Sequence, residues 1–275
     1  MNTTDTQLKQ ALNGDINAFQ KLFSEFQNQL KSYLYRLLAD RLDAEDLTHD
    51  TFVKAFDKIA SFKGESSLKT WVFQIATNLA YDLLRRRKRW ATDAQDRSKA
   101  LAIKSTDIQN EFHSVHNESQ YGSYEIKEHI DFCFTCLSKT LVPEEQIALI
   151  LKDIYDFSVT DIARIMNQSA GVIKHLLVDS RKTMVHIFDN RCALIGKNGA
   201  CNQCSELNGY FNPKQNKQEV LLSLEMVRSS DKYDMEELYD LRTTLIKSID
   251  PLRSSGSELQ EVIMKCTRKG IGEIA

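Results

Sequence analysis

Apolar residues recur at three- and four-residue steps along most of this chain, and this spacing constrains its fold more than any other feature. The first such run is Leu8, Leu12, Ile16, Phe19, Phe23 and Phe26. Residues three or four apart lie on one face of an α-helix, so each run predicts an amphipathic helix. The chain has 3 Pro and 10 Gly in 275 residues, which favours long helices over a β-rich fold. The sequence therefore predicts an all-α protein.

Charge and hydropathy limit the classes of function. The formal net charge is −2, so a case for nucleic-acid binding has to rest on local clusters of charge. No apolar run reaches the roughly 18 residues that a membrane-spanning helix needs. Residues 1–10 lack the apolar core of a signal peptide. We therefore expect a cytoplasmic protein without membrane insertion, in which the six Cys are reduced thiols or metal ligands.

An acidic helix opens the stretch 43–90, which also contains a polar loop and a basic helix. The acidic helix begins near Asp43 and carries four carboxylates early in its length: Asp43, Glu45, Asp46 and Asp50. A face of this kind is either simply solvated or complementary to a basic protein surface.

The next helix is predicted from Leu68 to about Lys88, after a loop at Gly64, with Ser66 or Ser67 as its cap. We expect its apolar seam to be Trp71, Ile75, Leu79 and Leu83. The other face and the end of the helix combine amides, hydroxyls, an aromatic ring and cations, which contact base edges, stack on bases and neutralise phosphate. These residues are Thr70, Gln74, Asn78, Tyr81, Arg85, Arg86, Arg87, Lys88 and Arg89.

Helical spacing stops at residues 91–123, which are polar with scattered charges and which we interpret as a linker. It returns at Tyr124, and Pro143 fits the first turn of the following helix. A segment ending at Met166, a turn at 167–169 and a helix from about 170 to 188 then predict a helix-turn-helix. A helical hairpin that serves only packing is the alternative.

Residues 8–90 resemble region 2 of bacterial sigma factors, most of all the compact extracytoplasmic-function group. The matching residues are Asp15 to Phe19, Asp43 to Leu47, Asp50 to Phe52, Phe62 to Gly64, Ser67, Thr70, Trp71, Ile75, Ala76, Asn78, Arg85 and Arg86. The helix-turn-helix downstream resembles sigma region 4. It departs from that pattern because Leu176, Val178 and Asp179 stand on the recognition helix, where such proteins carry more basic residues.

This resemblance implies an all-α protein with two helical domains joined by a linker and followed by a helical C-terminal extension. The expected domains are residues 1–90 (region 2-like), 91–123 (linker), 124–190 (region 4-like helix-turn-helix) and 191–275 (Cys-containing segment and extension). The implied partners are core RNA polymerase, promoter DNA and an inhibitory anti-sigma protein. The chain is expected to have no catalytic residues of its own. A stand-alone helix-turn-helix regulator and a metal- or redox-responsive regulator are the alternatives.

The resemblance also assigns residues to these partners. The polymerase-binding residues are Asp43, Glu45, Asp46 and Asp50. The residues expected to bind the minus-10 promoter element are Lys63, Ser66, Ser67, Thr70, Trp71, Gln74 and Asn78. Those expected to contact DNA phosphates are Arg85, Arg86, Lys88 and Arg89. The residues expected to contact the minus-35 element are Gly171, Lys174, His175 and Arg181.

Three cysteines lie in a Gly- and Asn-rich stretch after the helix-turn-helix: Cys192, Cys201 and Cys204. Two thiolates in a Cys-x-x-Cys spacing can bind one zinc ion, and a third can join them, but a tetrahedral site needs a fourth ligand. The candidates for that ligand are Cys133, Cys136 and His186. The alternatives are a redox-responsive thiol group and structural thiols without metal.

Overall fold

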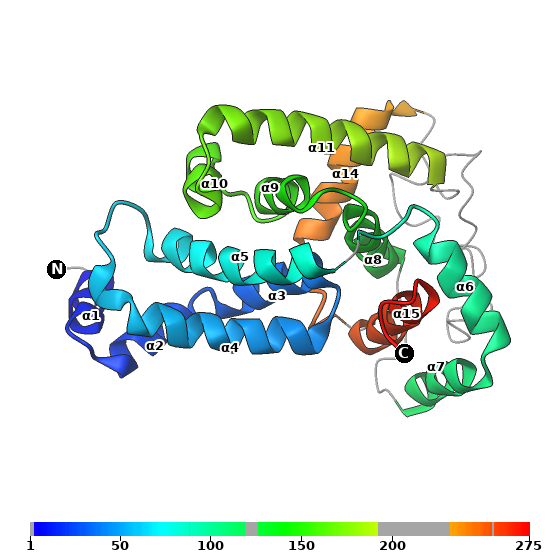
Figure 1. Ribbon diagram of the computed structural model, residues 1–275, viewed down its shortest axis with the longest axis horizontal. Coiled ribbons are helices and arrows are strands. Elements are labelled where there is room, and N and C mark those ends of the chain that lie inside the picture. The colour runs from blue at the N-terminus through cyan, green and yellow to red at the C-terminus, as the bar shows by residue number, and fades with distance from the viewer. Residues whose placement is uncertain (1–2, 88, 119–125, 192–231, 255) are drawn as a thin grey trace. The chain divides into compact units, whose positions relative to one another are not determined.

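The computed structural model describes residues 3–87, 89–118, 126–191, 232–254 and 256–275 (Figure 1). These residues form helices and connecting turns, with no strand in the described ranges, which confirms the all-α prediction. The helices are α1 (Thr3–Leu12), α2 (Ile16–Ser24), α3 (Gln27–Leu38), α4 (Arg41–Asp57), η1 (Ile59–Ser61), α5 (Leu68–Arg86), α6 (Ala94–Lys104), α7 (Thr106–Glu118), α8 (Ile126–Ser138), α9 (Pro143–Asp153), α10 (Val159–Met166), α11 (Ala170–Arg191), α14 (Met235–Lys247) and α15 (Ser257–Gly270).

The chain forms two compact units, each made of two segments. The first unit comprises Met1–Arg87 with Pro143–Leu177, and the second comprises Lys88–Val142 with Val178–Ala275. The first unit therefore contains the region 2-like helices together with α9, α10 and the start of α11. The domain boundaries expected at residues 90, 123 and 190 differ from this grouping and stay a prediction.

Several helix ends show ordinary capping chemistry. Asp15 accepts the backbone N–H groups at the start of α2, and Ser67 accepts the N–H of Thr70 at 3.0 Å at the start of α5. Pro143 is the first residue of α9, where its missing N–H costs no hydrogen bond. Gly64 has φ 71° in the loop before α5, a conformation that glycine adopts without a steric penalty. The helix-turn-helix is also confirmed, with Asn167 in the left-handed region between α10 and α11.

An aromatic cluster between α2 and α4 forms part of the core of the first unit. Phe19 packs against Phe23, Phe52 and Phe56, with ring centroids 5.3–6.0 Å apart. Phe19 and Phe23 are almost completely buried. Burying one such side chain stabilises a fold by roughly 1.5–3 kcal/mol, so this cluster fixes α4 against α2.

The expected apolar seam of α5 is wrong. Its buried residues are Thr70, Val72, Phe73, Ala76, Thr77, Ala80 and Leu84, whereas Trp71, Ile75, Leu79 and Leu83 are half-buried. The reason is that α5 has neighbours on two sides: α3 and α4 on one, α9 and α10 on the other (Figure 1). A helix covered on two sides buries more of its circumference than one seam.

In the second unit, the segment expected to be a linker contains α6 and α7. Both pack against α15, the last helix of the chain. Cys266 and Thr267 of α15 contact Ser98 of α6, and Lys265 pairs with Glu111 of α7 at 2.7 Å. Of the expected helical C-terminal extension, the described residues form α14 and α15, and residues 192–231 lie outside the described residues.

Candidate functional site

The acidic side chains of α4 differ in their exposure and in their ion pairs. The Asp46 and Asp50 side chains are exposed, the latter to 61%. Glu45 accepts a hydrogen bond from Lys31 Nζ at 2.5 Å, and this contact lowers the pKa of Glu45. Asp43 is ion-paired with Arg87 at the end of α5. Of the four predicted polymerase-binding residues, Asp46 and Asp50 are therefore the best placed to meet a partner.

Two apolar side chains lie on the same exposed stripe of α4. Leu42 is 71% exposed and Val53 is 41% exposed. With Asp46 and His49 they follow steps of four, three and four residues, so they line one face of the helix. Neither residue is among the predicted polymerase-binding residues. Their spacing from Asp46 and His49 in the sequence could have identified them, because it places two apolar side chains on the same helix face as the polar ones.

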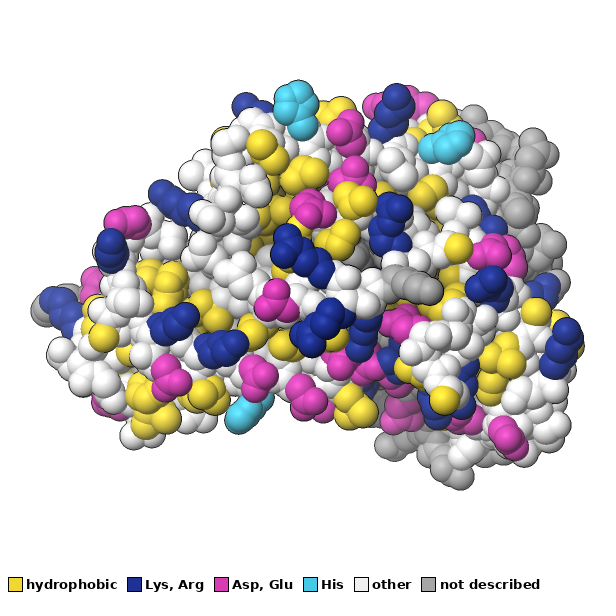
Figure 2. All heavy atoms as spheres, in the orientation of Figure 1, with side chains coloured by type: hydrophobic (Ala, Val, Ile, Leu, Met, Phe, Trp, Pro, Cys, Tyr) yellow, Lys and Arg dark blue, Asp and Glu magenta, His cyan; other side chains and the backbone are white. Residues whose placement is uncertain are grey.

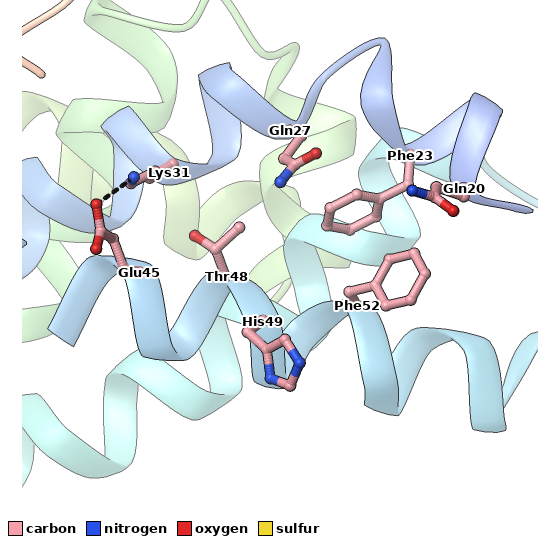
Figure 3. Close-up of a pocket in the computed structure, with 8 residues that line it drawn as sticks. All are labelled: Gln20, Phe23, Gln27, Lys31, Glu45, Thr48, His49 and Phe52. Atoms are coloured by element: carbon pink, nitrogen blue, oxygen red, sulfur yellow. Dashed lines mark hydrogen bonds and ion pairs between the residues drawn. The ribbon is translucent and has the colours of Figure 1, made fainter. Parts of the chain in front are cut away.

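A pocket of about 470 Å³ borders this stripe on the side of α2 and α3. Figure 3 shows the Phe23 and Phe52 rings facing each other at one end and the Lys31–Glu45 pair at the other. The two rings meet edge to face at 5.1 Å. His49 lies on the rim, so the pocket offers an apolar floor with polar and charged edges.

The loop before α5 forms a second hollow. Phe62 is buried and its ring lies 5.4 Å from that of Trp71. With the side chains of the loop they line a pocket of about 310 Å³. The lining residues are Ser61, Phe62, Lys63, Glu65, Ser66, Trp71, Gln74, Arg164 and Asn167. The structure thus brings together Lys63, Ser66, Trp71 and Gln74, as predicted for one site. It adds Arg164 and Asn167, which sequence reasoning missed because they are about 90 residues away in the chain.

Along α5, the predicted base-reading residues differ in exposure. Thr70 is 3% exposed, Gln74 is half-buried and Asn78 is exposed. Ser67 is exposed and caps the helix. The two less accessible side chains hydrogen-bond to α10, Thr70 to the Asp161 carboxylate and Gln74 to the Arg164 carbonyl.

The basic end of α5 includes exposed cations. Arg85 lies over the Tyr81 ring at 4.2 Å, and Arg86 donates to the Asp82 carbonyl at 3.0 Å. Arg86 and Arg89 are exposed, and Lys88 lies outside the described residues. On the face drawn in Figure 2, basic and acidic side chains are interspersed and no single charge covers it. The predicted phosphate contacts therefore rest on local groups such as these.

The recognition helix α11 presents each of its four predicted DNA-binding residues on the surface: Gly171, Lys174, His175 and Arg181. Val172 and Val178 are exposed beside them, to 42% and 65%, and Asp179 is exposed as well. The surface is thus weakly basic and partly apolar, as the sequence indicates.

The three cysteines of the zinc hypothesis, Cys192, Cys201 and Cys204, lie outside the described residues. Cys133 and Cys136 are buried on α8, with Cys136 Sγ 3.9 Å from Met264 Sδ and Cys133 Sγ 3.7 Å from Gln95 Nε2. His186 is hydrogen-bonded to Asn190. The described part of the chain has no group of three or more potential ligands placed to hold a metal.

Comparison with known proteins adds independent information. The Sigma-70 region 2 family matches residues 22–90. The ECF RNA polymerase sigma-E factor of Haemophilus influenzae is 28% identical over 62% of this chain and 86% of its own length. The ECF RNA polymerase sigma factor SigW of Bacillus subtilis is 27% identical over 64% of this chain and 92% of its own length.

A solved structure is similar as well: the sigma factor RpoE of Bartonella quintana, in complex with the anti-sigma factor NepR. The match covers 62% of this chain and 96% of the RpoE chain at 25% identity, with a TM-score of 0.44.

Among the described helices, none has the length and apolar character to cross a membrane.

The acidic α4, the loop before α5 and the basic end of α5 lie in this order within residues 22–90, the span that matches the Sigma-70 region 2 family. Over 62–64% of its length, the chain is similar to ECF RNA polymerase sigma factors, and its residues 22–90 match the Sigma-70 region 2 family.

Proposed function

We propose that this chain is a transcription initiation factor that directs core RNA polymerase to promoters. In this proposal α4 binds the polymerase, the loop and α5 bind and melt the minus-10 element, and α11 contacts the minus-35 element. The observation that carries it is the order within residues 22–90: an exposed acidic helix face, a loop pocket and a basic helix end, within the span that matches sigma-70 region 2.

The exposed stripe of α4 suits a basic protein partner. The Asp46 and Asp50 side chains are exposed, so cations of a partner can pair with them, which speeds association and fixes the register of the complex. Leu42 and Val53 supply apolar area at two points of the same stripe. Apolar area removed from water in a complex contributes favourably to binding.

The loop pocket suits an unstacked base. Extracting a base costs a few kcal/mol, which a pocket with an aromatic wall and polar edges can offset. Trp71 supplies the aromatic wall here, and Lys63 and Ser66 supply polar edges. Arg85, Arg86 and Arg89 then hold the phosphates of the adjoining DNA.

The same proposal places the protein in the cytoplasm with the polymerase. It assigns the chemistry of RNA synthesis to the polymerase and none to this chain. An anti-sigma protein as a further partner, and a zinc ion bound by the three downstream cysteines, stay hypotheses beside it.

A binding titration with core polymerase tests the assignment of α4. Asp46→Arg combined with Asp50→Arg reverses two exposed charges without touching the core, so helicity should be unchanged and core affinity should fall at least tenfold, or about 1.4 kcal/mol. Asp189→Arg with Asp240→Arg is the matched control, since both of these side chains are exposed on helices elsewhere. Equal affinity of the two double variants would contradict the assignment.

A further inference from the structure

Val178 of α11 is, after Leu42, the most exposed large apolar side chain among the described residues, with an exposed fraction of 65%. It lies near the middle of a helix of 22 residues, where the helix's own hydrogen bonds hold the backbone. A single exposed valine is common on protein surfaces and indicates no function by itself. The side chains around it on the helix therefore decide what it can contact.

The neighbours of Val178 on the helix surface are mostly basic. Residues three and four positions apart lie next to each other on a helix, so the groups one turn before and one turn after Val178 surround it. These exposed neighbours are Lys174, His175, Arg181 and Lys182. Two turns before Val178, Gly171 adds no side chain to the same face, and a Cβ there would meet only Ser169 Oγ at 3.7 Å. Val178 is thus an apolar point on an open, basic helix face.

Asp179 limits this basic face on one side. Its carboxylate is exposed, and it points about 100° around the helix axis from Val178. It follows Val172, the other exposed valine of α11, by seven residues, so these two side chains share the adjoining face. Phosphate is attracted by the cations around Val178 and repelled by Asp179. The face centred on Val178 is therefore the one that suits nucleic acid.

The small extent of the apolar area favours DNA over a protein partner. The core of a protein interface combines several apolar and aromatic side chains, whereas each neighbour of Val178 three or four residues away carries a charge or an imidazole. In the major groove of DNA, the C5-methyl group of thymine is an apolar group among the hydrogen-bonding edges of the bases. One apolar side chain among cations matches one methyl group between two phosphate backbones.

The shape of valine also suits this contact. Branching at Cβ leaves valine one strongly preferred rotamer in a helix, so the backbone of α11 fixes the position of its methyl groups. A contact fixed in this way loses little conformational freedom when it forms. It can therefore distinguish a base that carries a methyl group at this point from one that does not.

We propose that Val178 is a specificity-determining residue that reads a thymine of the minus-35 element through its C5-methyl group. The inference rests on the proposed function, because that function places α11 on duplex DNA. Lys174 and Lys182 lie one turn away on either side and bind the phosphates or a guanine that flank this thymine. The minus-35 element should therefore contain a thymine whose methyl group contributes to binding.

Replacing thymine by deoxyuridine tests this contact, because it removes the methyl group and keeps the hydrogen-bonding groups of the base. The full chain first selects duplexes from a pool of random sequence at low salt. Each thymine of a selected duplex is then replaced in turn by deoxyuridine, and binding is measured by fluorescence anisotropy. For the wild-type chain, we expect one thymine whose replacement weakens binding about fourfold, the effect of burying one methyl group.

Val178→Ala is the test variant and Val172→Ala is the matched control. The control makes the same substitution at an exposed valine of the same helix that points about 120° away. At the sensitive thymine, the ratio of thymine to deoxyuridine affinity should fall to about 1 in Val178→Ala and stay at about fourfold in Val172→Ala. The ratio compares two duplexes on one protein, so a general change in affinity cancels from it. Circular dichroism verifies that each variant is folded.

Equal ratios in the two variants would overturn the assignment of Val178, as would wild-type binding that no deoxyuridine replacement weakens. Weaker binding of Val178→Ala to core polymerase with an unchanged ratio would also overturn it, and would assign the residue to a protein contact.

Transcription by the wild-type chain with core polymerase is measured separately, so that the two proposals can fail independently. Initiation by wild type together with equal ratios in the two variants refutes the reading of thymine alone. Loss of the ratio in Val178→Ala without initiation by wild type refutes the proposed function and supports Val178 as a reader of duplex DNA.

Discussion

The carboxylate of Glu45 is held by the Lys31 ammonium, and the hydrogen bond between them lowers the pKa of Glu45 from its ordinary value of 4.5. A carboxyl group whose pKa is lower in the folded than in the unfolded chain stabilises the fold above the unfolded value. That contribution is lost as the pH falls through the folded pKa. The Glu45 side chain is 43% exposed, so solvent screening keeps the contribution small.

Glu45→Gln should therefore lower the free energy of unfolding at pH 7 by about 0.5 kcal/mol. The difference from wild type should shrink as the pH falls below 4.5 and disappear below the lowered pKa of folded Glu45, where the wild-type carboxyl group is protonated in both states. Urea unfolding of both proteins at several pH values measures this. A difference that persists unchanged at the lowest pH would show that the ion pair is not its source.

At the residue scale, Asn78 and Arg86 are expected to bind DNA in two different ways, the first through base edges and the second through phosphate. Asn78 is an exposed amide in the middle of α5, which suits base-edge contacts, and Arg86 is a cation at its end. Asn78→Ala should change the ranking of promoter variants in a binding assay with the polymerase complex. Arg86→Ala should weaken all of them and reduce the slope of log affinity against log salt by about 1. If both variants act alike on all promoters, this division is wrong.

At the scale of the element, two glycines in helices should respond to the same substitution with opposite signs. A Cβ at Gly270 of α15 would lie 3.1 Å from the backbone of Arg97 and Ser98 in α6, whereas one at Gly171 of α11 meets only the Ser169 hydroxyl at 3.7 Å. Gly270→Ala should cost about 1–3 kcal/mol through overpacking. Gly171→Ala should add about 0.4–1 kcal/mol by restricting the unfolded chain. Thermal unfolding of the two variants measures both, and a shared sign would contradict the packing described for α15.

Local chemistry made several elements predictable from sequence. Asp15, Ser67 and Pro143 act within one helical turn, so their positions alone indicate where α2, α5 and α9 begin. Asn167 similarly indicates the turn between α10 and α11. The grouping of Lys63, Ser66, Trp71 and Gln74 in one pocket followed for the same reason, because they are close in sequence.

Contacts between distant segments were not predictable in this way. The seam of α5 was assigned wrongly because α9 and α10 cover a side of α5 that the helix's own spacing does not reveal. Residues 94–118 were interpreted as a linker because they are polar, whereas α6 and α7 are held by α15, more than 130 residues later. Arg164 and Asn167 in the loop pocket were missed for the same physical reason.

At the scale of the whole molecule, the C-terminal extension is part of the second unit. Glu128 of α8 accepts the buried backbone N–H of Gly256 at 2.8 Å, and Trp90 Nε1 donates to Glu273 at 2.7 Å. The Arg242 guanidinium of α14 lies 4.5 Å from the Phe188 ring centroid at the end of α11. The extension therefore supplies packing partners to both the start and the end of the predicted region 4-like domain.

Deleting residues 252–275 should thus remove more helix than the deleted segment contains. Without α15, the Ser98 and Glu111 contacts of α6 and α7 are lost, and an isolated pair of short helices is marginal in water. Circular dichroism should show the additional loss, and limited proteolysis should cut within residues 94–118. A truncated chain that loses only the signal of α15 and resists cleavage there would show that α6 and α7 are stable alone.

Run-off transcription tests the central claim most directly. Core RNA polymerase is incubated with a library of genomic fragments, with and without the full chain, and the transcripts are mapped. We predict new transcripts with defined start sites only when the chain is present, and their loss with Asp46→Arg combined with Asp50→Arg but not with Asp189→Arg combined with Asp240→Arg. An identical set of transcripts with and without the chain would contradict the assignment of this protein as an initiation factor.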